Sequence, residues 1–176
     1  KHYFLLIPGE RARTPECIPD YLSGILTHPF RWNEICTASS AEEVAALVKG
    51  AGKLLSFDVN FREDIFESKD AAKAVYAPWL ERADILKLSE EEAEVFFGKN
   101  RERALSELSV GKKIFVTLGK KGAALYENGT MRECGTIDVR VIDTNGAGDA
   151  FYAGALRQID GGEKDGGKIL RYANIC

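Results

Sequence analysis

The sequence lacks the features of several large classes of protein. No apolar run approaches the ~20 residues needed to span a bilayer, and the short apolar stretch at residues 3–7 is closed by Pro8-Gly9. The formal net charge is -3, and basic residues occur only in short pairs such as Lys120-Lys121. We therefore expect no secretory signal, no membrane association and no nucleic-acid partner, and we interpret these pairs as solvated turns.

Residues that bind metals or form disulfides are also few. Only two histidines are present, and the four cysteines are too far apart to form a C-x-x-C pair: Cys17, Cys36, Cys134 and Cys176. This spacing disfavours a zinc site. Dispersed cysteines predict a reduced, cytoplasmic protein.

Both ends of the chain indicate a piece of a longer protein. The first residue is Lys1 rather than methionine, and Cys176 lies within an apparent helix that has no stop signal. We expect residues 1–176 to form a single partial domain.

What the sequence does contain is an alternation of strand and helix patterns. Apolar runs are expected to form strands at residues 3–7, 35–37, 54–59, 85–88 and 114–117, and helices are expected at residues 41–49, 68–82, 90–97 and 101–108. Ser39-Ser40 offers an N-cap for the first of these helices. The alternation predicts an α/β fold whose doubly wound, mostly parallel sheet is flanked by helices.

The pattern changes after Gly119. The turn Asn128-Gly129 predicts a hairpin between residues 123–127 and 130–133, and a further strand is expected at residues 136–142. A Gly-rich turn then leads into a helix over residues 143–156.

This Gly-rich turn carries the most specific chemistry. Gly146, Ala147 and Gly148 allow the backbone to approach a ligand and leave amide N–H groups unpaired at the helix N-terminus. Those amides and the helix dipole form an anion site suited to a transferring phosphate. Asp149 follows, either as an acidic residue that caps the helix or as a base that accepts a proton from a sugar hydroxyl. The turn is neither a Walker A loop nor G-x-G-x-x-G.

Residues 143–151, DTNGAGDAF, closely resemble the C-terminal signature of the ribokinase-like sugar kinases, the PfkB family. Three other segments are similar to family motifs in the same order: residues 57–62 (FDVNFR) to D-x-N-x-R, residues 84–92 (DILKLSEEE) to the N-x-x-E segment, and residues 116–123 (VTLGKKGA) to the nucleotide-site strand and turn. The matches extend over roughly residues 32–176. We identify the chain as the C-terminal portion of a fructokinase-like member, and the resemblance favours the base over the cap.

The resemblance implies an ATP-dependent kinase that phosphorylates a sugar hydroxyl, with a ketose such as fructose as substrate. The alternatives are a 2-keto-3-deoxygluconate kinase and a catalytically silent ribokinase-fold scaffold; a dinucleotide-binding oxidoreductase would need a Gly-rich fingerprint that is absent after the first strand. Nothing before Trp32 resembles the family's β lid or its Gly-Gly motif. Activity, sugar selection and a homodimer are therefore expectations for the full-length protein, and the isolated stretch is expected to be inactive if it lacks the sugar pocket.

The resemblance also assigns roles to individual residues. Asp149 is the implied base, and the amides of Gly146, Ala147 and Gly148 form the anion hole. The remaining implied contacts are Ser89, Thr117, Gly119, Gly122 and Asn174 for the nucleotide; Asp58, Asn60 and Arg62 for substrate or phosphate; Glu92 for Mg²⁺ through water; and Asp143 and Asn145 for a monovalent cation such as K⁺.

Some positions depart from the family pattern or allow a simpler interpretation. Ser89 stands where the N-x-x-E motif begins with Asn, and Asn145 replaces the commoner Thr. Arg62 could pair with Glu63 or Asp64 on the surface. Residues 90–92 could be a solvated helix start.

Overall fold

The protein is described by a computed structural model over residues 3–6, 40–50, 52–137 and 144–176. The chain divides into two compact units, Lys1–Asp84 and Ile85–Cys176. The strand expected at residues 35–37, the two histidines, Cys17 and Cys36 lie outside the described residues.

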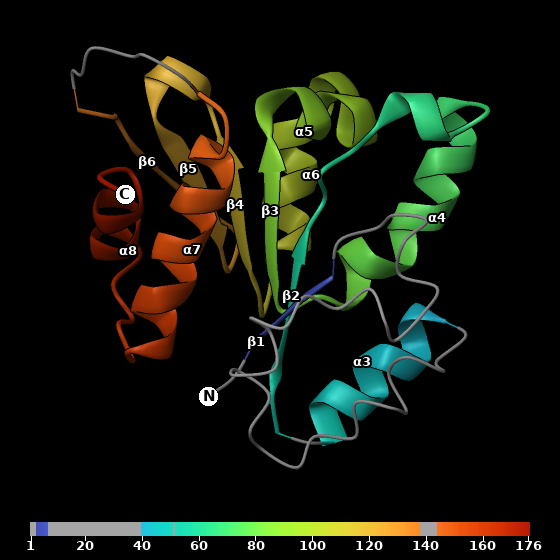
Figure 1. The fold of residues 1–176 in the computed structure, drawn as a ribbon, viewed down its shortest axis with the longest axis horizontal. Helices are drawn as coiled ribbons and strands as arrows, with labels where there is room; N and C mark the ends of the chain where they lie inside the picture. The colour runs from blue at the N-terminus through green and yellow to red at the C-terminus, as the bar shows by residue number, and fades with distance from the viewer. Residues whose placement is uncertain (1–2, 7–39, 51, 138–143) are drawn as a thin grey trace. The chain divides into compact units, whose positions relative to one another are not determined.

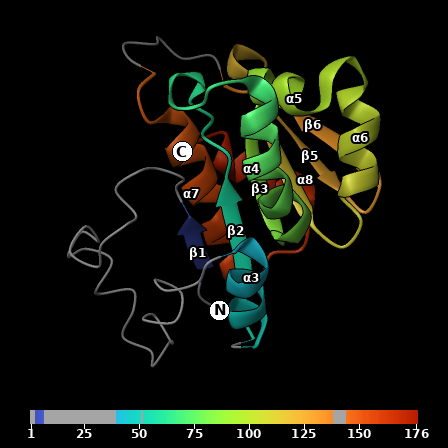
Figure 2. The same cartoon turned by 90° about the vertical axis from the view of Figure 1, so that its right-hand side faces the viewer.

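The first unit contains two parallel strands, β1 (Tyr3–Leu6) and β2 (Leu54–Asp58), which lie side by side in Figure 2. Its helices are α3 (Ala41–Gly50) and α4 (Lys69–Arg82), and a short 3-10 turn (Glu63–Ile65) follows β2.

A side-chain cap begins helix α3 of the first unit, and aromatic packing joins its helix α4 to strand β2. The Ser40 hydroxyl accepts a hydrogen bond from the Glu43 amide at 3.2 Å, which confirms Ser40 as the cap of α3. Phe57 of β2 stacks on Trp79 of α4 with ring centroids 5.7 Å apart, and Tyr76 lies 6.0 Å from the same ring. These contacts pack α4 against β2.

The second unit contains four strands in the spatial order in which they occur in the sequence. They are β3 (Ile85–Ser89), β4 (Lys113–Thr117), β5 (Ala123–Glu127) and β6 (Thr130–Cys134). β3 and β4 are parallel, whereas β5 is antiparallel to both β4 and β6. The helices are α5 (Glu90–Phe97), α6 (Arg101–Leu108), α7 (Ala147–Asp160) and α8 (Gly166–Ala173), and short 3-10 turns occupy Gly98–Asn100 and Gly119–Lys121 (Figure 1).

Helices cover both faces of this sheet. Phe115 of β4 contacts Phe151 and Tyr152 of α7, with ring centroids 6.0 and 6.4 Å apart. Leu125 points to the same face and meets Gly166 of α8. Its neighbour Tyr126 points to the other face, where α6 contacts β5. Burial, followed by the nearby Glu102 carboxylate, raises the pKa of the Tyr126 hydroxyl. This layered arrangement confirms the predicted α/β class.

Most predicted elements are confirmed, and two predictions are wrong in part. Thr136 and Ile137 are not in a strand, because the partner strand β5 begins at Ala123, which pairs with Cys134 at the end of β6; residues 138–142 lie outside the described ranges. The apparent final helix ends at Ala173, where the chain tightens through a bond from the Ile175 amide to the Tyr172 carbonyl. No helix in the described ranges is long and apolar enough to cross a bilayer.

Candidate functional site

Two parallel strands of the second unit end next to each other and form the base of the candidate site. Ser89 of β3 is the register partner of Thr117 of β4, so these two implied nucleotide-binding residues lie side by side. The Thr117 hydroxyl points toward the Leu88 carbonyl, at 3.5 Å. Ligands of α/β proteins commonly bind at the carboxyl ends of parallel strands, which is where these residues lie.

Ser89 and Glu92 form a reciprocal capping box at the start of α5. The Glu92 amide donates to the Ser89 hydroxyl at 3.1 Å, and the Ser89 amide donates to the Glu92 carboxylate at 2.7 Å. Replacement of the family's Asn by Ser is therefore compatible with a well-formed helix start. The box also fixes the Glu92 carboxylate beside the end of β3.

The acidic start of α5 is more than a solvated charge run. Glu90 pairs with Arg101 at 3.1 Å and with Lys121 at 3.5 Å, which links α5 to the turn after β4. Lys120 and Lys121 are both exposed, as the sequence predicts for a solvated turn.

The turn Gly119–Gly122 is closed on the protein itself. The Leu118 amide donates to the Gly122 carbonyl at 2.8 Å, and the Gly122 amide donates to the Gly119 carbonyl at 3.0 Å. Gly122 has φ +101°, and a Cβ there would overlap the Cys134 carbonyl oxygen. Gly119 has φ +56° and open space around its missing Cβ. Packing alone thus explains Gly122, whereas Gly119 borders free space.

Asn174 belongs to this same corner of the unit. Its carboxamide donates to the Cys134 carbonyl, and Cys134 is the register partner of Ala123. Four implied nucleotide-binding residues, Thr117, Gly119, Gly122 and Asn174, therefore surround the end of the β4–β5–β6 sheet. In this structure Asn174 holds β6 to the end of α8.

The second Gly-bearing turn leads into α7, which begins at the end of the sheet where β3 ends (Figure 1). Gly146 is the N-cap residue, with φ 76°, a left-handed conformation that favours glycine. The Ala147 amide donates to the Thr144 carbonyl at 3.1 Å. Within the described ranges no acceptor faces the amides of Gly148 and Asp149. These two amides are available to an anion.

Asp149 is the third residue of α7 and is exposed. The start of α7 has no side-chain capping bond, so Asp149 does not act as a hydrogen-bonding cap. Its carboxylate forms no ion pair and no hydrogen bond with any residue that the structure describes. The Asp149 carboxylate is therefore accessible to a ligand.

A buried lysine contacts the start of α7, and none of the roles that the resemblance assigns belongs to it. Lys87 of β3 is 8% exposed. A Cβ built on Gly148 would lie 3.2 Å from the Lys87 ammonium nitrogen and 3.6 Å from its Cε. The signal in the sequence is a lone charge within the apolar run of β3, although its contact with α7 could not be read from the sequence.

The first unit carries the residues assigned to substrate or phosphate at the end of β2. Asp58 is 5% exposed, and Asn60 has φ 39°, which is uncommon for a residue other than glycine. Arg62 is exposed and makes no ion pair with Glu63 or Asp64. Glu63 pairs with Lys69 instead, at 3.6 Å.

The structure describes only some of the residues that the resemblance assigns to cations. Asp143 lies outside the described residues, and Asn145 is exposed at the turn before α7. No group of three or more potential ligands (His, Cys, Asp or Glu) in the described ranges is arranged to hold a metal ion by itself. Glu92 alone fits the water-mediated Mg²⁺ contact that the family resemblance implies, since one carboxylate near phosphates is a common magnesium ligand set.

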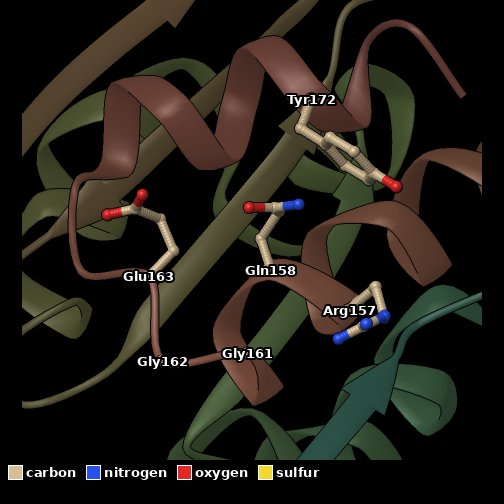
Figure 3. A pocket seen from close by; sticks show the side chains of 6 residues that line it. All are labelled: Arg157, Gln158, Gly161, Gly162, Glu163 and Tyr172. Carbon is tan, nitrogen blue, oxygen red and sulfur yellow. The ribbon is translucent and has the colours of Figure 1, made fainter.

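A hollow of about 390 Å³ lies at the other end of α7 (Figure 3). It is lined by Arg157, Gln158, Gly161, Gly162, Glu163 and Tyr172. Hydrogen bonds from the Asp165 and Lys164 amides lower the pKa of the Glu163 carboxyl. Residues 157–163 are two or more helical turns from Asp149, so the hollow is not part of the candidate site.

Comparison with known proteins identifies the same family as the motifs do. The family model for the pfkB family carbohydrate kinases matches residues 22–176. The chain is 34% identical to probable fructokinase-2 of Arabidopsis thaliana, with 86% of this chain and 47% of that protein aligned. It is 29% identical to the fructokinase of Escherichia coli, over 82% of this chain and 53% of that protein. The chain thus spans about half the length of these relatives.

Solved structures show the same fold. A double mutant of Vibrio cholerae fructokinase with fructose, ADP and potassium ion bound matches with a TM-score of 0.69 and 28% identity, over 78% of this chain and 47% of that one. A putative ribokinase II from Escherichia coli in complex with ATP and Mg²⁺ matches with a TM-score of 0.63 and 30% identity, over 77% of this chain and 44% of that one.

Proposed function

Because this chain belongs to the pfkB family of carbohydrate kinases, we propose that it is the nucleotide-binding and catalytic-base part of an enzyme that transfers the γ-phosphate of ATP to a sugar hydroxyl. The observation that carries the proposal is the start of α7. There, Asp149 makes no cap, and the Gly148 and Asp149 amides face no acceptor in the described part of the chain.

In this proposal the turn from Gly146 to Asp149 performs the chemistry. The amides of Gly146, Gly148 and Asp149 bind the transferring phosphoryl group at the positive end of the α7 dipole, whereas the Ala147 amide already donates to the Thr144 carbonyl within the turn. The Asp149 carboxylate accepts the proton from the attacking sugar hydroxyl. Phosphoryl transfer depends mainly on positioning and charge stabilisation, so an ordinary exposed carboxylate is adequate as the base.

The nucleotide is proposed to lie across the carboxyl ends of β3 and β4. Ser89 and Thr117 lie together there, and the open space at Gly119 admits a ligand close to the backbone. Asn174 holds the outer end of this site through Cys134.

Metal ions fit this arrangement as accessory groups. Glu92 is held beside the site by the capping box and would contact Mg²⁺ through water; when bound, Mg²⁺ neutralises phosphate charge. Asp143 and Asn145 are proposed for K⁺, in line with the potassium ion named for the Vibrio cholerae relative.

The proposed substrate is a ketose, with fructose first. Fructokinases recur among the relatives, while the selecting residues of the family lie largely in a part that this sequence does not match. Asp58, Asn60 and Arg62 are the proposed contributions of this chain to substrate or phosphate binding. A homodimer is proposed only for the full-length protein.

The decisive experiment is a kinase assay on the full-length protein with MgATP and a panel of acceptors. The panel contains fructose, glucose, ribose, 2-keto-3-deoxygluconate and a ribonucleoside, and ADP release is measured for each. Fructose-dependent ADP release with formation of a sugar phosphate supports the proposal. Preference for ribose or the nucleoside would overturn the ketose assignment, and absence of transfer to every acceptor would support a silent scaffold.

A binding measurement separates the enzyme classes. Stabilisation of the protein against heat by MgATP is expected, because a ligand that binds only the folded state raises its stability. Stabilisation by NAD without stabilisation by MgATP would identify a dinucleotide-binding protein instead.

A further inference from the structure

Aromatic rings hold the loop that joins β2 to α4. Tyr76 of α4 is 1% exposed, and its ring centroid lies 6.0 Å from that of Phe57 in β2. The same ring lies 6.1 Å from Phe61 and 5.7 Å from Phe66, which belong to the loop and stack on each other at 6.1 Å. One buried ring therefore joins the strand, the loop and the helix, and such ring pairs contribute more than the apolar area that they bury.

The backbone is unusual immediately before Phe61. Val59 is fully buried, and Asn60 has a φ of 39°, in the left-handed region that few residues other than glycine enter. Such a conformation persists where the surrounding structure enforces it. Val59 packs on one side of Asn60 and Phe61 on the other, so packing of the Phe61 ring helps to maintain this turn of the chain.

Arg62 follows Phe61 and takes its direction from it. The Arg62 backbone is extended, with φ -122° and ψ 105°, and its side chain is exposed. Successive side chains of an extended segment point to opposite sides. Because the Phe61 ring packs against Tyr76, Arg62 points away from α4. The ion pair between Glu63 and Lys69 also fastens this loop, but it is exposed and contributes little.

We propose that Phe61 is a positioning residue, whose ring orients the Arg62 guanidinium toward oxygens of the acceptor sugar or of the transferring phosphate. The inference rests on the proposed function and extends it to a residue that acts through its neighbour. A guanidinium binds oxygens through parallel hydrogen bonds, and this geometry requires an accurately placed side chain. An arginine that is already held in place also loses less freedom when the ligand binds.

The test uses Phe61→Leu in the full-length protein, which keeps an apolar side chain and removes the ring. Steady-state kinetics with fructose and MgATP measures kcat and KM. We expect kcat/KM for fructose to fall about tenfold, because a small displacement of a binding group disturbs the productive geometry. Phe61→Tyr keeps the ring and should restore the wild-type kcat/KM. If Phe61→Leu does not fold, Phe66→Leu takes its place, since it removes the ring that stacks on Phe61.

The same kinetics identify which ligand Arg62 contacts. A higher KM for fructose at unchanged kcat would support positioning toward the sugar. A lower kcat at unchanged KM would support positioning toward the phosphate during transfer.

A double variant shows whether Phe61 acts through Arg62. Arg62→Gln alone should lower kcat/KM for fructose at least as much as Phe61→Leu does. Adding Phe61→Leu to Arg62→Gln should then cause less than about a twofold further loss, whereas independent effects would multiply. Multiplied losses in the double variant, or wild-type kinetics in Arg62→Gln, would overturn the inference.

Trp79→Leu is the matched control. Trp79 is a half-buried ring of α4 that stacks on Phe57 within β2, 5.7 Å away. Its replacement should lower thermal stability at least as much as Phe61→Leu and leave kcat/KM for fructose unchanged. Equal losses of kcat/KM in the two variants would indicate a general structural effect and would overturn the inference.

The outcomes for the inference and for the proposed function are separate. A folded Phe61→Leu protein with the kcat and KM of wild type would overturn the role of Phe61 and leave the kinase proposal intact. A wild-type protein that phosphorylates no acceptor would overturn the proposed function, and this inference with it.

Discussion

The two Gly-bearing turns of the second unit look similar in the sequence but are built differently. The turn Gly119–Gly122 is closed by its own backbone hydrogen bonds, and Gly122 packs directly against Cys134. The turn before α7 is open: residues 144–147 are exposed, and two amides beyond them face no acceptor in the part of the chain that the structure describes. The turn Gly119–Gly122 bonds its backbone polar groups to one another, whereas the turn before α7 leaves the Gly148 and Asp149 amides accessible.

This difference shows that glycines in similar turns can be required for different reasons, by packing in one turn and by access for a ligand in the other. Gly122 is required by the packing of the protein, because any side chain would overlap a backbone carbonyl. Gly148 is in contact with the end of a flexible charged side chain, and Gly119 borders open space. Substitutions at the closed turn should therefore affect folding first, and substitutions at the open turn should affect chemistry first.

The largest expected effect belongs to the open turn. Asp149→Asn should lower kcat by about 10²–10⁴-fold, the usual contribution of a general base. Affinity for MgATP should persist, because the amides of the turn remain in place. The measurements are steady-state kinetics and calorimetry on the full-length protein.

Asp70→Asn is the control for this prediction. Asp70 also lies in the first turn of a helix, α4, where Asp favours the helix dipole. Its replacement should leave kcat unchanged. If Asp149→Asn keeps turnover within about threefold of wild type, well under the range for a general base, the catalytic assignment is wrong.

The second effect belongs to the closed turn. Gly122→Ala should lower the free energy of unfolding by about 3 kcal/mol, because the Cβ would overlap the Cys134 carbonyl in a backbone conformation that only glycine adopts readily. Gly119→Ala should cost about 1–2 kcal/mol, since only its left-handed conformation is unfavourable. Urea denaturation followed by circular dichroism measures both. Equal losses at the two positions would contradict the distinction between closed packing and open space.

Local signals in the sequence predicted much of the fold. The helices at residues 90–97 and 101–108 have the predicted boundaries, and Ser89 with Glu92 forms the capping box that begins the first of them. Asn128-Gly129 forms the predicted hairpin turn, with φ 49° and 79°. These features depend on neighbours within a few residues, so periodicity and capping chemistry are sufficient to find them.

Long-range contacts could not be predicted in the same way. The approach of Lys87 to Gly148 joins a strand to a helix that begins about sixty residues later, and no spacing rule connects them. The end of β6 at Cys134 is likewise set by its partner, because β5 begins at Ala123 opposite Cys134, so the β-branched pattern that follows was wrongly predicted to be a strand at Thr136 and Ile137. Tertiary partners outweigh local propensity at such positions.

The third prediction tests whether the open space at Gly119 receives the nucleotide. Gly119→Val should weaken MgATP binding about tenfold, because a side chain would occupy the space through which a ligand approaches the backbone. Gly111→Val is the control, since Gly111 also has a left-handed φ of +78° and open space but lies before β4, at the opposite end of that strand. It should cost stability without affecting affinity. Unchanged MgATP affinity in a folded Gly119→Val protein would place the nucleotide elsewhere.

The smallest effect concerns Ser89, which caps α5 and is also one of the residues proposed to contact the nucleotide. Its hydroxyl accepts the Glu92 amide, so Ser89→Ala should lower the free energy of unfolding by about 1 kcal/mol, the usual value of an N-cap. Ser89→Asn should retain that stability, because Asn caps a helix about as well as Ser. The two variants therefore separate the cap from any contact with the nucleotide, once MgATP affinity is measured beside urea denaturation. A role limited to the cap predicts that Ser89→Asn matches wild type in both measurements; a tighter or weaker MgATP complex at unchanged stability would instead show that the side chain at this position touches the ligand.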